Sequence, residues 1–377
     1  MFEQQTYPDK LYLNTGVPQL THTPTFKETL NKSVWPRLLG KIGYPSSFEL
    51  RAMQLSFASA QFSSKKKQTR RDRLLSDLEV LVPWASLETV IEPHYPKTDG
   101  KQGRPSMGLS RMLRMYVLQQ VMGFSDEGME DAIYDSPSLQ LFMGIDLGRD
   151  AVPDATTLLR FRRLLEEYSL GKGIFDAVNR QLAEQGVFLK EGTVVDATII
   201  SAPSSTKNEK KERDPEMRST RKGNQYHFGM KAHIGADAAS GLVHTLITTA
   251  ANAHDVTQVH GLLHGEEQQV YGDSGYLGAV KRPENKDKDV KWVIAMRHGT
   301  RRKHRDSGTE KGQLIDQMEK LKSQIRAKVE HPFYWIKVAF KHRKVRYRGL
   351  AKNTAQLYSL FALSNLFLAR RCMPLAG

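Results

Sequence analysis

The chain has 377 residues, of which 39% are hydrophobic and 8% aromatic, so it can bury a substantial core in one or two domains. Its formal net charge of +15 indicates a polyanionic partner, most often nucleic acid, although a merely basic soluble protein is the alternative. The one cysteine, Cys372, excludes an intramolecular disulfide framework and a cysteine-based zinc site, and it fits a reducing compartment.

The first 60 residues contain five prolines and show little periodicity, so we expect an irregular N-terminal arm over residues 1–60. They do not begin with the basic segment and apolar run of a signal peptide. The basic run SSKKKQTRRDR, residues 63–73, follows. It is explained equally well as a solvated helix start and as a phosphate contact.

Residues 74–185 have helical periodicity throughout, which predicts a helical DNA-binding or dimerisation domain over residues 61–186. Ser125 is a plausible N-cap, and Pro153 with Asp154 begins another helix. Short helices in series could form a helix-turn-helix with TTLLRFRRLL as its recognition helix. A helical bundle without a DNA role has the same pattern. The residues that could meet DNA there are Thr156, Thr157, Arg160, Arg162 and Arg163.

From about residue 187 the pattern changes to strands, and we expect a mixed α/β domain over residues 187–340. GTVVDATII is the first strand, and the polar residues 204–224 are expected to form a mobile loop. A hairpin around DAASG, a helix, two further strands and a long helical region broken near Pro332 follow. Residues 341–377 supply a basic stretch and a buried C-terminal helix that is too short and polar to span a bilayer.

Two aspartates end apolar strands in this domain, Asp196 in GTVVDATII and Asp273 in VYGDSGY. Neighbouring carboxylates repel each other unless a cation lies between them, and oxygen ligands without cysteine favour Mg²⁺ or Mn²⁺. The long helix offers Glu330 as a third carboxylate, with Arg326 four residues before it and Lys337 seven after. Such a set suits two-metal phosphodiester chemistry. An Arg–Glu pair on a solvated helix is the competing interpretation of Arg326 and Glu330.

Long segments of the chain, between about residues 60 and 370, resemble insertion-sequence transposases of the DDE class, specifically the IS-five family. They include PWASLETVIEPHYPK, VPDATTLLRFRRLLE, VDATIISAPSSTKN, KGNQYHFGMKAHIGADAASGL and IRAKVEHPFYWIK. The resemblance implies an RNase H-like mixed sheet flanked by helices, preceded by a mostly α-helical N-terminal domain. It implies the catalytic and metal-binding triad Asp196, Asp273 and Glu330. The family signature Tyr-x2-Arg-x3-Glu-x6-Lys has Ser323 at its tyrosine position.

The resemblance also implies Mg²⁺ as cofactor, for which Mn²⁺ can substitute, and double-stranded DNA as partner. The enzyme would cleave DNA at terminal inverted repeats of its element and transfer the freed 3′ hydroxyl to target DNA. We expect a homodimer or larger assembly on DNA and a cytoplasmic, nucleoid-associated location. The basic stretch KHRKVRYRGL lies just beyond Glu330. The expected DNA-binding residues are Arg326, Lys337, Lys231, His233, Arg160, Arg163, Arg343 and Arg346.

Two other functions stay open at this level. A hydrolytic nuclease of the same fold would use the same two-metal attack without strand transfer. A non-catalytic DNA-binding remnant would bind DNA equally well with and without Mg²⁺ and would never cut it. The presence of all three acidic residues argues against the remnant.

Overall fold

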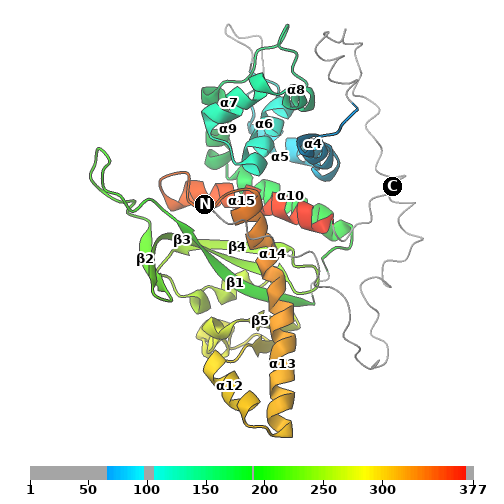
Figure 1. The fold of residues 1–377 in the computed structure, drawn as a ribbon. Helices are drawn as coiled ribbons and strands as arrows, with labels where there is room; N and C mark the ends of the chain where they lie inside the picture. The colour runs from blue at the N-terminus through cyan, green and yellow to red at the C-terminus, as the bar shows by residue number, and fades with distance from the viewer. Residues whose placement is uncertain (1–65, 97–105, 189–190, 371–377) are drawn as a thin grey trace, which may run out of the picture. The chain divides into compact units, whose positions relative to one another are not determined.

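The computed structural model describes residues 66–96, 106–188 and 191–370 (Figure 1). These residues belong to one compact unit that runs from Ser56 to Gly377. The predicted arm, residues 1–60, lies outside the described residues, as does Cys372.

The described chain before the sheet is helical, as its periodicity predicts, and polar side chains fix where its helices begin. Ser125 accepts a hydrogen bond from the backbone N–H of Gly128 at 3.0 Å, and Asp154 accepts one from that of Thr157 at 2.6 Å. Both are N-caps, as predicted. The helices are α4 (Arg70–Leu81), α5 (Trp84–Ile91), α6 (Leu109–Met122), α7 (Asp126–Asp135), α8 (Pro137–Met143), α9 (Ala155–Glu167) and α10 (Leu170–Glu184).

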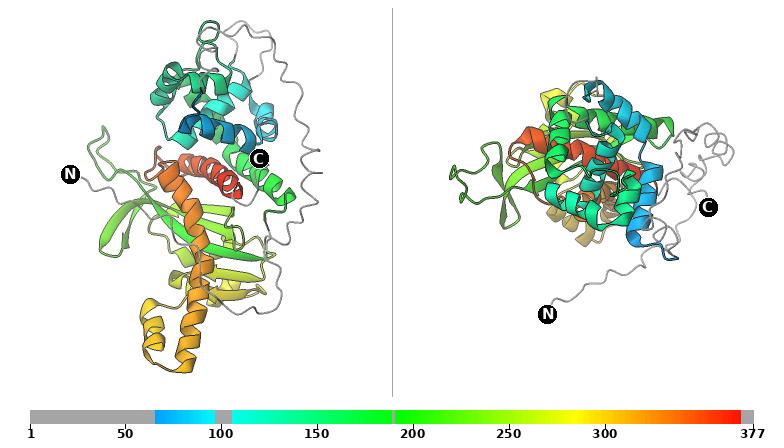
Figure 2. Two further views of the ribbon diagram at one scale, coloured as in Figure 1. Left: turned by 45° about the vertical axis from the view of Figure 1, so that its right-hand side comes forward. Right: turned by 90° about the horizontal axis from the view of Figure 1, so that it is seen from above.

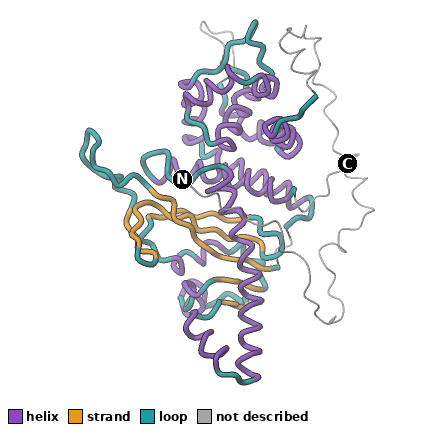
Figure 3. The backbone as a smooth tube through the Cα atoms, in the orientation of Figure 1, coloured by secondary structure: helices purple, strands orange, loops and turns teal. Residues whose placement is uncertain are grey.

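A mixed sheet follows, with strand order β2-β3-β1-β5-β6 and with β4 paired to β3. The strands β2, β3, β4 and β1 pair antiparallel, whereas β1, β5 and β6 pair parallel. Figure 3 shows the strands in one layer with helices above and below it. Their bounds are β1 Gly192–Ser201, β2 Arg218–Lys222, β3 Gln225–Asp237, β4 Val243–Ala250, β5 Gln269–Gly272 and β6 Lys291–Ile294.

The predicted mobile loop over residues 204–224 is wrong in its last part, because residues 218–222 form β2. Lys222 pairs with Gln225, so β2 and β3 make a tight hairpin. Four of the five residues of β2 are exposed. An edge strand is held by its backbone hydrogen bonds and needs no buried side chains, so polar composition did not reveal it. The hairpin around DAASG, between β3 and β4, is confirmed.

The chain after β4 continues through α11 (Val259–Leu262), β5, β6, α12 (His298–Asp306) and α13 (Glu310–Arg326). A 3₁₀ turn, Ala327–Val329, then leads into α14 (Glu330–Tyr334) and a π-helical turn, Trp335–Ala339. The helical geometry therefore changes from α to 3₁₀ at Ala327–Val329, before Pro332 rather than at it. Pro332 lies in the first turn of α14, where a missing N–H is tolerated.

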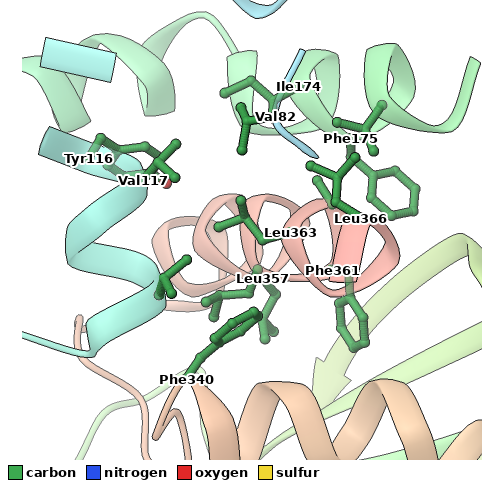
Figure 4. Packing of buried hydrophobic residues seen from close by; sticks show 14 of the residues in the cluster. Val82, Tyr116, Val117, Ile174, Phe175, Phe340, Leu357, Phe361, Leu363 and Leu366 are labelled. Atoms are coloured by element: carbon green, nitrogen blue, oxygen red, sulfur yellow. The ribbon is translucent and has the colours of Figure 1, made fainter. Parts of the chain in front are cut away.

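The last helix, α15 (Leu350–Ala369), is the centre of the main hydrophobic core. It packs against α10, β4, α6 and α9, so it joins the helices to the sheet. Leu357 and Phe361 are fully buried there, with Phe340 and Phe175 close by (Figure 4). Asn365 accepts a hydrogen bond from Val243 N–H and donates one to Val243 O, which satisfies the start of β4. The predicted buried C-terminal helix is confirmed.

None of the helices in the described ranges is long and apolar enough to cross a membrane.

Candidate active site

The parallel pairing of β1 and β5 brings the two predicted aspartates together. Thr193 pairs with Val270 and Val194 with Tyr271. Continued by two residues, this register places Asp196 opposite Asp273. Asp196 lies within β1, and Asp273 follows the last residue of β5, where its side chain accepts a hydrogen bond from Gly275 N–H at 2.8 Å. The sheet topology therefore makes neighbours of residues that are far apart in the sequence.

Arg326, the last residue of α13, lies between the two aspartates. Its Nη1 atom is 3.9 Å from Asp196 Oδ2 and 3.8 Å from Asp273 Oδ2. Arg326 is thus directed at the sheet, where its ion-pair partners are Asp196 and Asp273 rather than Glu330. Glu330 begins α14 one turn later and is exposed. The structure therefore does not contain the solvated Arg326–Glu330 pair of the competing interpretation.

The electrostatic environment of Asp196 favours its neutral form. The pKa of Asp196 is raised from 3.8 to about 6, first by burial and then by the charges of Asp273 and Glu330. The Ala197 N–H, which donates to Asp196 Oδ1, and Arg326 act in the opposite direction. One arginine therefore does not neutralise the acidic group, and an additional cation would be favourable here.

No three His, Cys, Asp or Glu side chains within the described ranges are close enough together to form a ready metal site. Asp196 and Asp273 supply only carboxylate oxygens, which are the ligands that hard divalent cations prefer. Glu330 is near enough to affect the pKa of Asp196 but belongs to no such preformed cluster.

Tyr276 is a neighbour of the site that the sequence analysis missed. Its side chain is 1% exposed, and its hydroxyl has no hydrogen-bond partner in the structure. The pKa of Tyr276 is raised well above its usual value, first by burial and then by the charges of Asp196, Asp255 and Asp273. Its place three residues after Asp273 in GDSGY was a signal available in the sequence.

Lys231 and His233 share one side of β3, as predicted, and both approach Asp255. Lys231 Nζ lies 2.9 Å from Asp255 Oδ1, and His233 Nδ1 lies 3.6 Å from the same atom. His233 is fully buried, and burial lowers its pKa to about 4. Its burial gives no support to the predicted contact of His233 with DNA, which stays a prediction. Lys231 is mostly covered and already paired.

The two predicted arginines of α9, Arg160 and Arg163, are exposed, but Arg162 between them is not. Arg162 makes two hydrogen bonds of 2.7 Å to Asp126 of α7 and stacks over Tyr347 at 4.7 Å. Its possible contact with DNA is thus a wrong prediction. Arg162 ties α9 to α7 and to the segment before α15, because a buried guanidinium needs an anionic partner.

The basic stretch 341–350 lies beside the end of β1. Ser201 N–H donates to Arg343 O, and Val345 N–H donates to Ser201 O. The side chain of Arg343 is exposed, whereas Arg346 donates to Phe124 O at 2.8 Å. Lys337, in the π-helical turn, is half-buried, and burial and the nearby Lys222 lower its pKa. Arg326 is thus the cation that contacts the two aspartates, while Lys337 lies near Glu330 and close to Lys222 and Arg343.

Comparison with known protein families gives two matches. A family model described as a transposase DDE domain matches residues 188–366. A second, described as a transposase domain (DUF772), matches residues 62–164. The first match contains the sheet, Asp196, Asp273 and Glu330, and the second contains helices α4 to α8 and most of α9. No match to a solved structure was found.

Proposed function

Because the chain is an insertion-sequence DDE transposase, a metal-dependent enzyme that cleaves DNA and transfers its strands, we propose that it acts on terminal inverted repeats and belongs to the IS-five family. Its mixed sheet flanked by helices is the RNase H-like fold of a DDE domain. We assign Asp196, Asp273 and Glu330 as its catalytic triad. The adjacency of Asp196 and Asp273 around Arg326 is the observation that carries this assignment.

The residues present suit two Mg²⁺ ions, for which Mn²⁺ could substitute. Asp196 and Asp273 offer oxygen ligands at one point of the sheet, and the pKa of Asp196 is raised by burial and by the neighbouring charges of Asp273 and Glu330. Glu330 would supply the third carboxylate of the ligand set. Two such ions lower the pKa of the attacking water and stabilise the leaving 3′ oxygen.

The other site residues act on the DNA substrate. Arg326 would neutralise the scissile phosphate, and Lys337 a neighbouring phosphate, by charge-assisted hydrogen bonds. The exposed Arg160, Arg163 and Arg343 would contact phosphates further along the duplex. Hydrolysis frees a 3′ hydroxyl, which then attacks target DNA in line. The two element ends would be held by a homodimer or larger assembly, in the cytoplasm.

The first experiment compares cleavage of a labelled duplex carrying the terminal repeats of the element, with Mg²⁺ or with EDTA. The variants are Asp196→Asn, Glu330→Gln and, as a control, Glu310→Gln at the exposed far end of α13. We expect metal-dependent nicking at the repeat ends by wild type and by Glu310→Gln. A loss of more than about 100-fold is expected in the two site variants, since each removes a metal ligand and the loss of a mere second-shell partner already costs about 10–100-fold.

Equal cutting by Glu330→Gln would remove Glu330 from the triad. Cleavage without joining of the 3′ end to a supplied target duplex would favour the hydrolytic nuclease over the transposase reaction at these ends. Metal-independent binding without any cutting by wild type would overturn the proposal.

A further inference from the structure

Helix α12 has a basic surface that neither the hydrophobic core nor the proposed site uses. The segment Arg297–Asp306 reads RHGTRRKHRD, and none of the residues of α12 is buried. Arg302 and Arg305 lie on one face of the helix, three residues apart. Their side chains are 70% and 60% exposed. Asp306 is the one acidic residue of the helix, so the surface is strongly cationic.

The ion pairs of Arg302 and Arg305 are local and weak. Both guanidinium groups approach the same residue, Asp306, through Nε at 3.4 and 3.2 Å. Exposed pairs of this kind contribute between zero and about 1 kcal/mol. One carboxylate also cannot neutralise two arginines. The remaining N–H groups of both side chains are therefore available for a phosphate, which arginine binds in a bidentate manner.

The helix is nevertheless held firmly to its neighbour, α13. Arg301 Nε donates to Asp316 Oδ1 at 2.7 Å, and the Thr309 hydroxyl caps α13 by accepting from Gly312 N–H. At the base of the pair, Glu319 accepts from Met296 N–H at 2.8 Å. These contacts make α12 and α13 one helical hairpin, which extends past the edge of the sheet in Figures 1 and 2.

The hairpin is built on the helix that ends in Arg326. Asp316, which anchors α12, precedes Arg326 by ten residues, or about 15 Å at 1.5 Å per helical residue. A DNA strand advances about 3.4 Å per nucleotide, so this distance corresponds to roughly four or five base pairs. The point where α12 is anchored to α13 is therefore within reach of a duplex that starts at the aspartate pair and follows α13.

We propose that α12 is a DNA-backbone clamp in which Arg302 and Arg305 contact phosphates about five base pairs from the scissile bond. A nucleic acid fits this surface better than an acidic protein, because α12 itself carries no large apolar side chain that could anchor a protein interface. The exposed Leu314, Met318 and Leu321 of the hairpin belong to α13. The clamp carries no sequence specificity, since phosphate contacts position the duplex without reading bases. This inference rests on the proposed function, in which DNA ends enter the aspartate site.

The test measures binding of a terminal-repeat duplex by the full chain as a function of salt, in EDTA, so that no cleavage interferes. We compare wild type with the double variant Arg302→Gln/Arg305→Gln and with the charge-preserving control Arg302→Lys/Arg305→Lys. Each lost phosphate contact reduces the slope of log K against log salt by about 0.9. We expect the glutamine variant to lose about two units of slope and the lysine variant to keep most of it.

A second duplex, ending three base pairs from the scissile bond on the side that reaches α12, identifies where the contact lies. Wild type should bind this shortened duplex with the smaller slope of the glutamine variant, and the glutamine variant should not distinguish the two duplexes. The glutamine variant should need more of the full duplex than wild type to reach half-maximal cutting, because it binds the DNA more weakly. Far-UV circular dichroism confirms that both variants are folded.

An unchanged slope for the glutamine variant would overturn the clamp while leaving the proposed function standing, provided that wild type still cuts. Equal losses in the glutamine and lysine variants would also overturn it, because an electrostatic clamp tolerates lysine. If the slope falls as expected but wild type never cuts, the clamp is supported and the proposed transposase reaction at these ends fails.

Discussion

The carboxyl group of Asp196 lies in surroundings that favour its protonated form. Burial and the charge of Asp273 raise its pKa to about 6, so the folded, metal-free protein binds this proton more tightly than the unfolded chain does. Between about pH 4 and pH 6 the folded state therefore holds more protons. By linkage, the free energy of unfolding falls as pH rises through this window and stays lower above it. The arrangement that suits a metal ion thus destabilises the protein without one.

The variant Asp196→Asn should stabilise the metal-free protein at pH 7.5, because it removes a charge that burial disfavours. The expected increase in the free energy of unfolding is at most about 3 kcal/mol, from a pKa shift of roughly two units. At pH 4 the increase should nearly vanish. Denaturant unfolding at both pH values measures it.

Added Mg²⁺ provides the control for this prediction. It should raise the melting temperature of wild type and leave that of Asp196→Asn almost unchanged, because a ligand stabilises only the state that binds it. A variant that is less stable than wild type at pH 7.5 without metal would contradict the prediction.

Helix α9 uses its two faces for different purposes. Arg160 and Arg163 are exposed, whereas Arg162 is buried against Asp126 and Tyr347. The ion pair is partly buried, and the arginine lowers the pKa of Asp126. An arginine-rich helix therefore need not present all its arginines to DNA. Of the three arginines within residues 160–163, one packs inside the protein and two are exposed and free to bind a partner.

Replacing Arg162 by alanine should destabilise the fold, while replacing Arg160 and Arg163 should not. Loss of Arg162 leaves a partly buried carboxylate without its cation and removes the ring contact to Tyr347, at a cost of about 3–5 kcal/mol. The double variant Arg160→Ala/Arg163→Ala should change the free energy of unfolding by less than about 0.5 kcal/mol. Thermal unfolding compares them.

The same pair of variants separates stability from DNA affinity. If Arg160 and Arg163 contact phosphates, their loss should weaken binding and lower its salt dependence at unchanged melting temperature. A fully stable Arg162→Ala would mean that this arginine is not the structural tie between α9 and α7.

At the scale of the whole molecule, the helical region and the sheet share one hydrophobic core. The main core cluster runs from Leu75 to Ala369 and includes residues from α4 to α15 as well as from β1, β3 and β4. Helix α15 lies at the centre of this cluster. The two family matches, residues 62–164 and 188–366, are therefore not separated by a gap in packing.

Thermal unfolding of residues 56–377 should be one cooperative transition, because the main core joins the helices to β1, β3 and β4, and the small second cluster around Val195, Val270 and Tyr276 is built on the same sheet. The variant Phe361→Ala removes a fully buried ring and should lower the free energy of unfolding by about 3–5 kcal/mol. The measurements are calorimetry and single-tryptophan fluorescence at Trp84, in α5, and at Trp292, in β6. All three should report the same unfolding midpoint, and Phe361→Ala should lower that midpoint equally in each.

Separate midpoints for Trp84 and Trp292 would show instead that the helices and the sheet fold independently. The predicted division at residues 186 and 340 would then describe true domains.

The sequence by itself determined the local structure and the chemical inventory of this protein. Capping residues such as Ser125 and Asp154 and the apolar spacing define helices locally, and the strands of GTVVDATII and the DAASG hairpin follow from residue type. These signals depend on neighbours within a few residues, which is why they can be read from the chain. The sequence resemblance likewise indicated the transposase family before any fold was known.

Only the tertiary structure decided which residues meet. The parallel register of β1 and β5 places Asp196 beside Asp273, and the direction of α13 puts Arg326 between them. His233 and Arg162 are buried in the folded protein, although their positions in the sequence pattern are like those of surface residues. Strand β2 and the exposed face of α12 were also not predicted, because both lie in polar sequence without a local pattern. Pairing across a sheet and burial depend on distant parts of the chain, and no local pattern carries that information.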